Sequence, residues 1–372
     1  MQISSVQLRD FRTFSRAEAR LGHGLTVVHG PNGAGKSNLL EAIYYGCTAR
    51  SPRTRNEREL VRFGAEAARV VVKLADGRQE HELTVGFGAG PAAERSSKRM
   101  TADGAPVERL LDVAHRPLLS VFMPDRLELL KGAPALRRAH LDQVVAAIWP
   151  ARAATRREYG QVLAQRNALL ARIRSGSASR GTLATWDREL ASKALALRRL
   201  RADATSLLAA PFSERARLLG CSGEVMLAYR PRSHAADEDE FVAELQERLP
   251  SDLDRGFSGH GPHRDELAIL RDGRELRVYG SQGEQRLALL ALLLAERAVL
   301  AGERQLTPVM LLDDVMSELD SERRELLARE LSTDGQSVIA TTDLGHVPGA
   351  ADSSVTRLRV SPGAILQEAL AA

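Results

Sequence analysis

The chain is poor in cysteine and has no long uninterrupted apolar run. Its two cysteines, Cys47 and Cys221, lack CxxC spacing, which argues against a metal or redox motif and fits a reducing compartment. The longest apolar run, residues 287–300, contains Glu296 and Arg297 and is shorter than the roughly 20 residues of a membrane span. The N-terminus alternates like a strand and lacks the apolar core of a signal peptide. We therefore expect a cytoplasmic location and no membrane partner.

Aromatic residues and lysines are also scarce. Aromatics make up 4% of the chain, which argues against the stacking platforms that bind single-stranded nucleic acid. Only five of the 52 basic residues are lysine, a bias that we attribute mainly to base composition. The net charge of +4 permits a nucleic-acid partner without requiring one. A length of 372 residues with 44% hydrophobic content indicates a globular protein of two or three domains.

The hydrophobic pattern predicts strands at both ends of the chain and helices in the middle. Alternating runs over residues 68–87 around Asp76-Gly77, and again around Asp272-Gly273, predict two hairpins, and residues 86–100 read as a flexible loop. Residues 126–248 are mostly helical in pattern, with an αα-hairpin formed by residues 151–174 and 182–210. We expect residues 1–124 and 250–372 to form one α/β domain and residues 125–249 to form a helical arm.

The motif GPNGAGKS at residues 30–37 matches the pattern GxxxxGK[ST] between an expected strand and an expected helix. Loops of this form point their backbone N–H groups at a phosphate chain, and the following helix adds its positive dipole end. The motif predicts ATP as cofactor: Lys36 would bridge the β- and γ-phosphates and Ser37 would bind Mg²⁺. The residues expected to surround the nucleotide are Gly30, Pro31, Asn32, Gly33, Ala34, Gly35, Lys36, Ser37 and Asn38.

A second motif, PVMLLDDVMSELD at residues 308–320, is an apolar strand that ends in two carboxylates. A strand of this kind is buried in a parallel sheet, and we expect it beside the strand of the phosphate-binding loop. Asp313 would then hold Mg²⁺ and Asp314 would polarise the attacking water. Asp313 follows Lys36 by 277 positions, so one nucleotide-binding head is expected from both ends of the chain, with the helical arm inserted between them.

A third motif, YGSQGEQR at residues 279–286, begins a long apolar helix. A polar, glycine-containing helix start offers free N–H groups and is a second candidate anion site, although an ordinary helix cap has the same pattern. Its position about thirty residues before Asp313 resembles the signature motif of ATP-binding-cassette ATPases, and Ser317 to Asp320 resembles their D-loop. That resemblance implies a head-to-head homodimer on ATP, in which one subunit presents the following residues to the other subunit's nucleotide: Ser281, Gln282, Gly283, Glu284 and Asp320.

Within this class the sequence resembles the RecF family of recombination and repair ATPases, which is related to SMC heads. The resemblance implies ATP-dependent binding of double-stranded DNA and of single-strand/double-strand junctions. It also implies action at gaps with RecR and RecO to help load a recombinase, and a nucleotide contact by Arg12. The matching segments are residues 9–14, 30–43, 124–142, 259–267, 279–286 and 311–320.

Three departures from the cassette pattern predict slow hydrolysis, suited to a switch. Met123 stands about where many members carry a glutamine, and Asp314 replaces the commoner glutamate after the metal-binding aspartate. Thr341 or Thr342 stands where a histidine is usual.

Two other classes share parts of this pattern. A transporter ATPase subunit would need a membrane partner, and a phosphate-loop kinase would not dimerise on ATP.

The segment GHGPHRDE at residues 259–266 contains metal-ligand residue types, but its spacing matches no strong zinc pattern, so we expect a structural loop.

The helical hairpin carries eleven arginines and one lysine against four acidic residues between positions 151 and 210. Phosphate contacts on that surface are plausible, and an ordinary solvated face accounts for the same charges.

Overall fold

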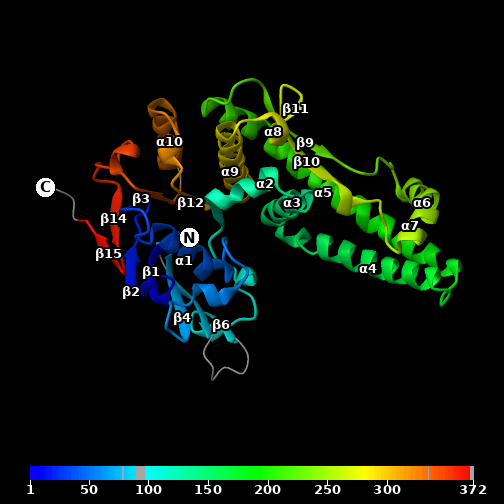
Figure 1. The fold of residues 1–372 in the computed structure, drawn as a ribbon, viewed down its shortest axis with the longest axis horizontal. Coiled ribbons are helices and arrows are strands. Elements are labelled where there is room, and N and C mark those ends of the chain that lie inside the picture. The colour runs from blue at the N-terminus through cyan, green and yellow to red at the C-terminus, as the bar shows by residue number, and fades with distance from the viewer. Residues whose placement is uncertain (78, 89–96, 334, 369–372) are drawn as a thin grey trace. The chain divides into compact units, whose positions relative to one another are not determined.

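A computed structural model describes residues 1–77, 79–88, 97–333 and 335–368 (Figure 1). The chain forms two compact units, one of residues 1–125 with 306–372 and one of residues 126–305. We call them the head unit and the helical unit and describe each by itself. Among the described residues no helix is both long and apolar enough to cross a membrane.

A mostly parallel six-stranded sheet in the head unit carries the phosphate-loop motif and the carboxylate motif. Its order is β15-β14-β3-β13-β12-β8, and only the β14–β15 pair is antiparallel. Because β13 lies between β3 and β12, the expectation that the two motif strands are neighbours is wrong. The strand bounds are Leu25–His29 for β3, Leu119–Phe122 for β8, Val309–Asp313 for β12, Ser337–Thr341 for β13, Thr356–Ser361 for β14 and Ala364–Gln367 for β15.

A second, antiparallel sheet of the head unit has the order β2-β1-β4-β5-β6-β7. The hairpin expected around Asp76-Gly77 is confirmed by the pairing of β4 with β5. Part of the loop expected at residues 86–100 is instead strand β6; residues 89–96 lie outside the described residues. The bounds are Gln2–Phe11 for β1, Phe14–Arg20 for β2, Ala67–Ala75 for β4, Glu80–Gly88 for β5, Ser97–Ala102 for β6 and Ala105–Pro106 for β7.

Helix α1 (Lys36–Thr48) packs into one apolar core with both sheets. Leu39, Leu40 and Ile43 of this helix are fully buried with Val72 of β4 and Ala340 of β13. Burial of the four larger side chains, all of these except Ala340, stabilises the unit by roughly 6–12 kcal/mol before entropic costs. The remaining helical segments are Glu57–Leu60 (η1), Leu110–Asp112 (η2), Pro124–Leu127 (η3), Met316–Glu318 (η7), Ser321–Thr333 (α10) and Leu344–His346 (η8).

One side chain links the two sheets of the head unit. The amide of Gln336, which directly precedes β13, accepts from the N–H of Ile3 (2.9 Å) and donates to the carbonyls of Ile3 and Gly22 (2.7 Å each). Gln336 is 2% exposed, so these bonds satisfy a buried amide while joining residues more than 300 positions apart. The two ends of the chain are therefore parts of the same unit.

The helical unit contains the expected αα-hairpin. Helices α4 (Thr155–Arg174) and α5 (Leu183–Leu218) share an apolar core that includes Val162, Leu190 and Ala194. Helix α5 continues past Pro211, where the sequence pattern predicted its end, because Phe212 and Ala216 extend its buried face. The other elements are α2 (Glu128–Lys131), α3 (Pro134–Ile148), η4 (Pro150–Arg152), η5 (Arg180–Thr182), α6 (Glu238–Glu247), α7 (Leu249–Arg255) and η6 (Pro262–Arg264).

The compact units place the second boundary after Gln305, whereas the sequence placed it after residue 249. The reason is strand pairing: β10 (Glu266–Arg271) pairs with β9 (Val225–Arg230), which follows the long helix α5. The hairpin expected around Asp272-Gly273 is confirmed, but its second strand β11 spans only Arg274–Glu275. The chain then continues as α8 (Leu276–Tyr279) and α9 (Gln282–Arg304).

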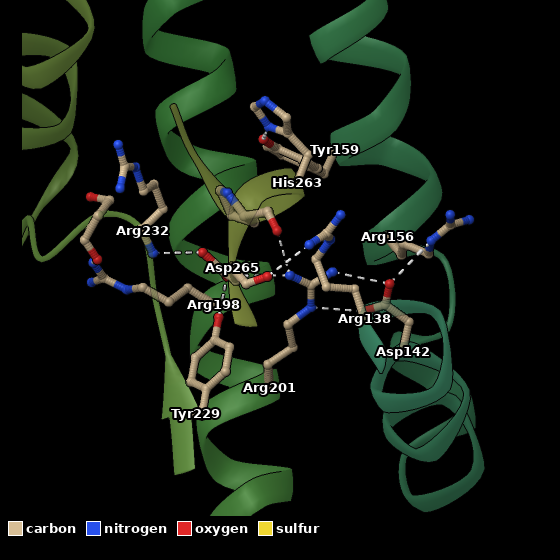
Figure 2. A network of polar contacts seen from close by, with 12 residues as sticks. Arg138, Asp142, Arg156, Tyr159, Arg198, Arg201, Tyr229, Arg232, His263 and Asp265 are labelled. Carbon is tan, nitrogen blue, oxygen red and sulfur yellow. Dashed lines mark hydrogen bonds and ion pairs between the residues drawn. The ribbon is translucent and has the colours of Figure 1, made fainter. Parts of the chain in front are cut away.

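A buried polar network joins α3, α5, β9 and η6 within the helical unit (Figure 2). Arg201 forms two bonds with Asp142 (2.8 and 3.0 Å) and a third with Asp265 (3.2 Å). Asp265 also accepts from the Tyr229 hydroxyl and from the Arg232 N–H at 2.7 Å. Each carboxylate thus has charged or polar donors.

The histidines beside this network have structural partners, as expected for the loop at 259–266. The Tyr159 hydroxyl lies 2.6 Å from His263 Nδ1, and His263 Nε2 lies 2.9 Å from the Ser258 carbonyl. The neutral ring therefore donates from Nε2 and accepts at Nδ1. Burial lowers the pKa of His263, in agreement with a neutral ring. His260 Nε2 lies 2.6 Å from Glu244.

Asp265→Asn is expected to destabilise the helical unit by about 3 kcal/mol, because it leaves the buried guanidinium of Arg201 with one carboxylate fewer. Urea unfolding followed by circular dichroism measures the change. Asp239→Asn is the matched control, since Asp239 has 87% side-chain exposure and lies 3.6 Å from Arg188. Equal stability of the two variants would contradict a structural role for the network.

A candidate nucleotide-binding site in the head unit

The loop between β3 and α1 adopts a conformation that requires its glycines. Gly30, Gly33 and Gly35 have φ angles of 153°, 77° and 112°, a region that other residues avoid. A Cβ on Gly30 would also lie 2.2 Å from the Val360 carbonyl oxygen. Pro31, Asn32 and Gly33 are exposed, whereas Ala34 is buried. The sequence thus folds into an open turn whose tip faces solvent and whose base begins a helix.

Lys36 lies folded over this loop. Its Nζ donates to the carbonyls of Gly30 (2.9 Å) and Pro31 (3.1 Å). Burial lowers the pKa of Lys36, and the charges of Asp314 and Asp313 oppose that shift. The two carboxylates favour the charged form of Lys36, and a lysine ammonium is a compact point charge that can bind a phosphate.

The carboxylate motif meets the loop despite the strand between them. Asp313 ends β12 and is paired in register with Ala340 of β13, which is paired with Val28 of β3. The carboxyl ends of these parallel strands lie at one edge of the sheet, and the Ser37 hydroxyl is close enough to Asp313 to affect its pKa. Burial raises the pKa of Asp313, the Ser37 hydroxyl opposes that rise and the charge of Asp314 reinforces it. The two predicted metal ligands therefore lie near one another.

Asp314 lies in a strained position beside this pair. Its φ is 51°, in the left-handed region, and its N–H donates to the Ala340 carbonyl at 3.0 Å. The Oδ1 atom is buried and has no hydrogen-bond partner among the described residues. Such an atom at the edge of the candidate phosphate site is able to accept a hydrogen bond from a water or a ligand.

A buried carboxylate that the sequence reasoning missed organises the loop's other side. Glu41, in the second turn of α1, has no exposed side-chain surface. It accepts two bonds from Arg12 (2.9 and 2.8 Å), one from Arg53 (3.1 Å) and one from Ser51 (2.6 Å). The available signal was a single acidic residue within the apolar run LLEAI. This side chain holds Arg12 and Arg53 against the helix that begins at the loop.

Arg53 and Asn38 lie between this cluster and the predicted metal ligands. Arg53 donates to Asn38 Oδ1 at 2.9 Å, and Asn38 donates to Thr13 Oγ1 at 3.1 Å. The charge of Arg53 lowers the pKa of Asp313 against the rise that burial causes. Arg12, expected to contact nucleotide, keeps 18% side-chain exposure and also donates to the Glu59 carbonyl at 2.8 Å. The structure thus places Arg12, Asn38, Lys36 and Asp313 in the same unit.

Two residues behind the other departures, Met123 and Thr341, also have defined surroundings. Met123, 2% exposed, belongs to the apolar core of the head unit. The Thr341 hydroxyl bonds to the backbone of Asp343, donating at 2.9 Å and accepting at 3.2 Å. Asp320, from the segment that resembles a D-loop, caps α10, with its Oδ1 accepting from the Arg323 N–H at 2.9 Å.

The third motif lies in the helical unit, at the start of α9. Ser281 and Glu284 form a reciprocal capping box, with Glu284 Oε2 accepting from the Ser281 N–H at 2.8 Å. Ser281, Gln282 and Gly283 are exposed, whereas Glu284 is held by Arg271 and by Ser222 at 3.1 Å. The helix cap is present, and it leaves the glycine-containing turn accessible.

The fold and the site define the class of this protein: an ATPase head of the ATP-binding-cassette type, with a long helical segment. The model of the RecF/RecN/SMC N-terminal domain family matches residues 2–360. A curated RecF from Herpetosiphon aurantiacus is 36% identical over 383 residues, covering 98% of this chain and 99% of the relative. The chain belongs to the RecF family of DNA replication and repair proteins.

Other relatives agree with this assignment. The RecF of Heliobacterium modesticaldum is 35% identical, covering 93% of each chain. A solved structure of RecF with ATP, described as the recombination mediator protein of the RecFOR pathway, has a TM-score of 0.83 at 27% identity, covering 99% of this chain and 98% of that one. A solved Smc head bound to part of ScpA has a TM-score of 0.62 at 16% identity, which shows a shared fold. The resemblance inferred from the sequence is confirmed.

Proposed function

We propose that this protein is an ATP-driven switch of recombinational repair. The observation that carries the proposal is the convergence of the loop lysine, Ser37 and the buried Asp313 at one edge of the head sheet. The Lys36 ammonium neutralises the β- and γ-phosphates of ATP, and the open loop supplies backbone N–H groups. Arg12 contributes a further cation beside α1.

Mg²⁺ fits the residues of this site, since a hydroxyl and a carboxylate oxygen are the ligands that it prefers. Ser37 and Asp313 would hold the ion, which would offset phosphate charge when bound. Asp314, whose Oδ1 has no partner among the described residues, orients the attacking water. Its side chain is shorter than a glutamate, and Met123 lies in the core. Both features favour slow hydrolysis as a reset.

ATP dimerises two heads, and the start of α9 in one subunit contacts the nucleotide of the other. The support is the exposure of Ser281, Gln282 and Gly283 beside a completed capping box, because a helix start of this kind binds anions. Glu284 fixes that turn, and the D-loop residue Asp320 lies across the dimer interface.

The dimer binds double-stranded DNA at single-strand gaps and junctions and, with RecR and RecO, helps load the recombinase. The named function of the curated relatives in DNA replication and repair supports this step, as does the description of the solved RecF structure as a mediator of the RecFOR pathway. The arginine-rich helical hairpin supplies positive charge for phosphate contacts.

Ser281→Arg is expected to abolish ATP-dependent dimerisation, because a long cation in the exposed turn blocks approach of a second head. Light scattering with and without ATP and gapped duplex DNA measures the mass. Gly302→Arg is the matched control, since Gly302 is exposed near the other end of α9 and a Cβ added there would meet no atom within 4 Å. A wild type that binds ATP but stays monomeric would contradict the proposed role of Ser281 and favour a kinase-like function.

A further inference from the structure

Two histidines and an aspartate converge in the antiparallel sheet of the head unit, outside the nucleotide site. His81 is the second residue of β5, Asp103 lies in the turn between β6 and β7, and His115 follows η2. One donor atom of each side chain lies within 4.8 Å of the donor atoms of the other two. We propose that His81, Asp103 and His115 form a binding site for a divalent transition metal of the Zn²⁺ class.

The carboxylate is fixed so that one oxygen faces both rings. Asp103 Oδ1 accepts from the Glu82 N–H at 2.8 Å, and the Asp103 N–H donates to the Glu82 carbonyl at 2.8 Å. Its left-handed φ of 50° places the side chain back over β5. Oδ2 then lies 2.7 Å from His81 Nδ1 and 3.6 Å from His115 Nε2. Ligand atoms on one tetrahedral metal are about 3.3 Å apart for bonds near 2.0 Å, so both distances to the carboxylate oxygen are close to that spacing.

An ordinary ion pair accounts for only part of this cluster. The bond to Asp103 satisfies His81 Nδ1, but His115 Nε2 is buried and has no hydrogen-bond partner among the described residues. A buried ring nitrogen without a hydrogen-bond partner is costly, and the 3.6 Å distance from His115 Nε2 to Asp103 Oδ2 is too long for a hydrogen bond. A metal between them satisfies both, since it binds neutral imidazole and carboxylate together.

The stacking of the two imidazole rings means that one ring has to move before a metal can bind. The imidazoles of His81 and His115 are stacked, with centroids 4.0 Å apart and planes 12° apart. A metal lies near the plane of each ring that binds it, so one ring must rotate about χ2. His81 and His115 keep 18% and 22% side-chain exposure, which leaves room for that rotation and a path for the ion. Two histidines and one carboxylate also leave a coordination position for water.

The metal would have a structural role, because it links the start of β5, the β6–β7 turn and the segment after η2. The test is titration of the nucleotide-free full chain with Zn²⁺ by calorimetry and with Co²⁺ by visible absorption. We expect one equivalent per chain with a Kd below about 10 μM and a rise in melting temperature of roughly 5 °C at a hundredfold excess over Kd.

Variants separate this site from other ligands. His115→Gln and Asp103→Asn are expected to weaken binding at least tenfold. His23→Gln, which removes an exposed ring bonded to Gln2 at 2.5 Å, is expected to leave it unchanged. Asp313→Asn is also expected to bind one equivalent of metal, which would show that the metal does not bind at the nucleotide site. Two results would overturn the proposal. One is absence of binding at about 100 μM metal, a concentration far above the Kd of structural sites, and the other is equal affinity in His115→Gln and His23→Gln.

Discussion

Asp313→Asn is expected to reduce Mg²⁺-dependent ATP hydrolysis by about 10²–10³-fold and to raise the melting temperature of the nucleotide-free protein. The two effects have one cause. Burial and the neighbouring Asp314 raise the pKa of Asp313, so the folded state disfavours the charge that the proposed metal site requires. Removing the charge relieves that cost and removes the ligand.

The expected change in melting temperature of Asp313→Asn depends on pH. A carboxyl whose pKa is raised on folding destabilises the folded state at pH values where it is ionised, and the cost disappears below its ordinary pKa near 4. The gain in melting temperature of Asp313→Asn over wild type should therefore be present at pH 7 and shrink toward pH 4. Differential scanning calorimetry at both pH values and a phosphate-release assay measure the two quantities.

Asp112→Asn is the control for this experiment. Asp112 belongs to the same unit, has 66% side-chain exposure and lies 3.7 Å from Arg109, so neither stability nor hydrolysis should change. A variant Asp313→Asn that melts below wild type at pH 7 would show that the carboxylate stabilises the fold, contrary to the direction inferred from its burial.

Glu41→Ala is expected to destabilise the head unit by about 3–5 kcal/mol and to weaken ATP binding at least tenfold. It removes a fully buried carboxylate, so Arg12 and Arg53 lose three hydrogen bonds and Ser51 loses one. Arg53 also bonds Asn38 next to the loop, so the nucleotide site loses its support. Guanidinium unfolding and binding of a fluorescent ATP analogue measure the two effects.

Glu41→Gln separates the loss of the negative charge from the loss of the side chain's size and hydrogen-bond acceptors. The amide keeps the size of the side chain and one acceptor oxygen, so the loss of stability should be smaller than for Glu41→Ala. Glu18→Gln is the exposed control, with 46% side-chain exposure and a 3.7 Å contact to Arg20. Unchanged ATP affinity in Glu41→Ala would mean that the arginines do not position the nucleotide loop.

Part of this site was readable from the sequence because its signals are local. The glycines of residues 30–35 are needed at positive φ, and the apolar strand ending at Asp313 shows where a carboxylate leaves a buried sheet. Short motifs of this kind depend on backbone conformation and on burial of a few neighbours. The hairpin at Asp76-Gly77 is predictable for the same reason.

Other features depend on residues far apart in the chain. Gln336 binds the backbone of Ile3, and Arg201 binds both Asp142 and Asp265. Side-chain periodicity carries no information about such partners, since any buried polar residue gives the same pattern. The order of strands in the sheet also depends on distant segments. The sequence predicted β12 beside β3, whereas in the structure β13 lies between them.

The sequence by itself determined the phosphate loop, the class of ATPase and the RecF family, because these depend on ordered local motifs. The tertiary structure decided where the units divide, how Ser37 comes close to Asp313 despite an intervening strand, and which carboxylate holds Arg12 and Arg53. The physical reason is that parallel strands bring their carboxyl ends to one edge whatever the number of residues between them. Buried charges, in turn, find their partners only when distant segments pack together.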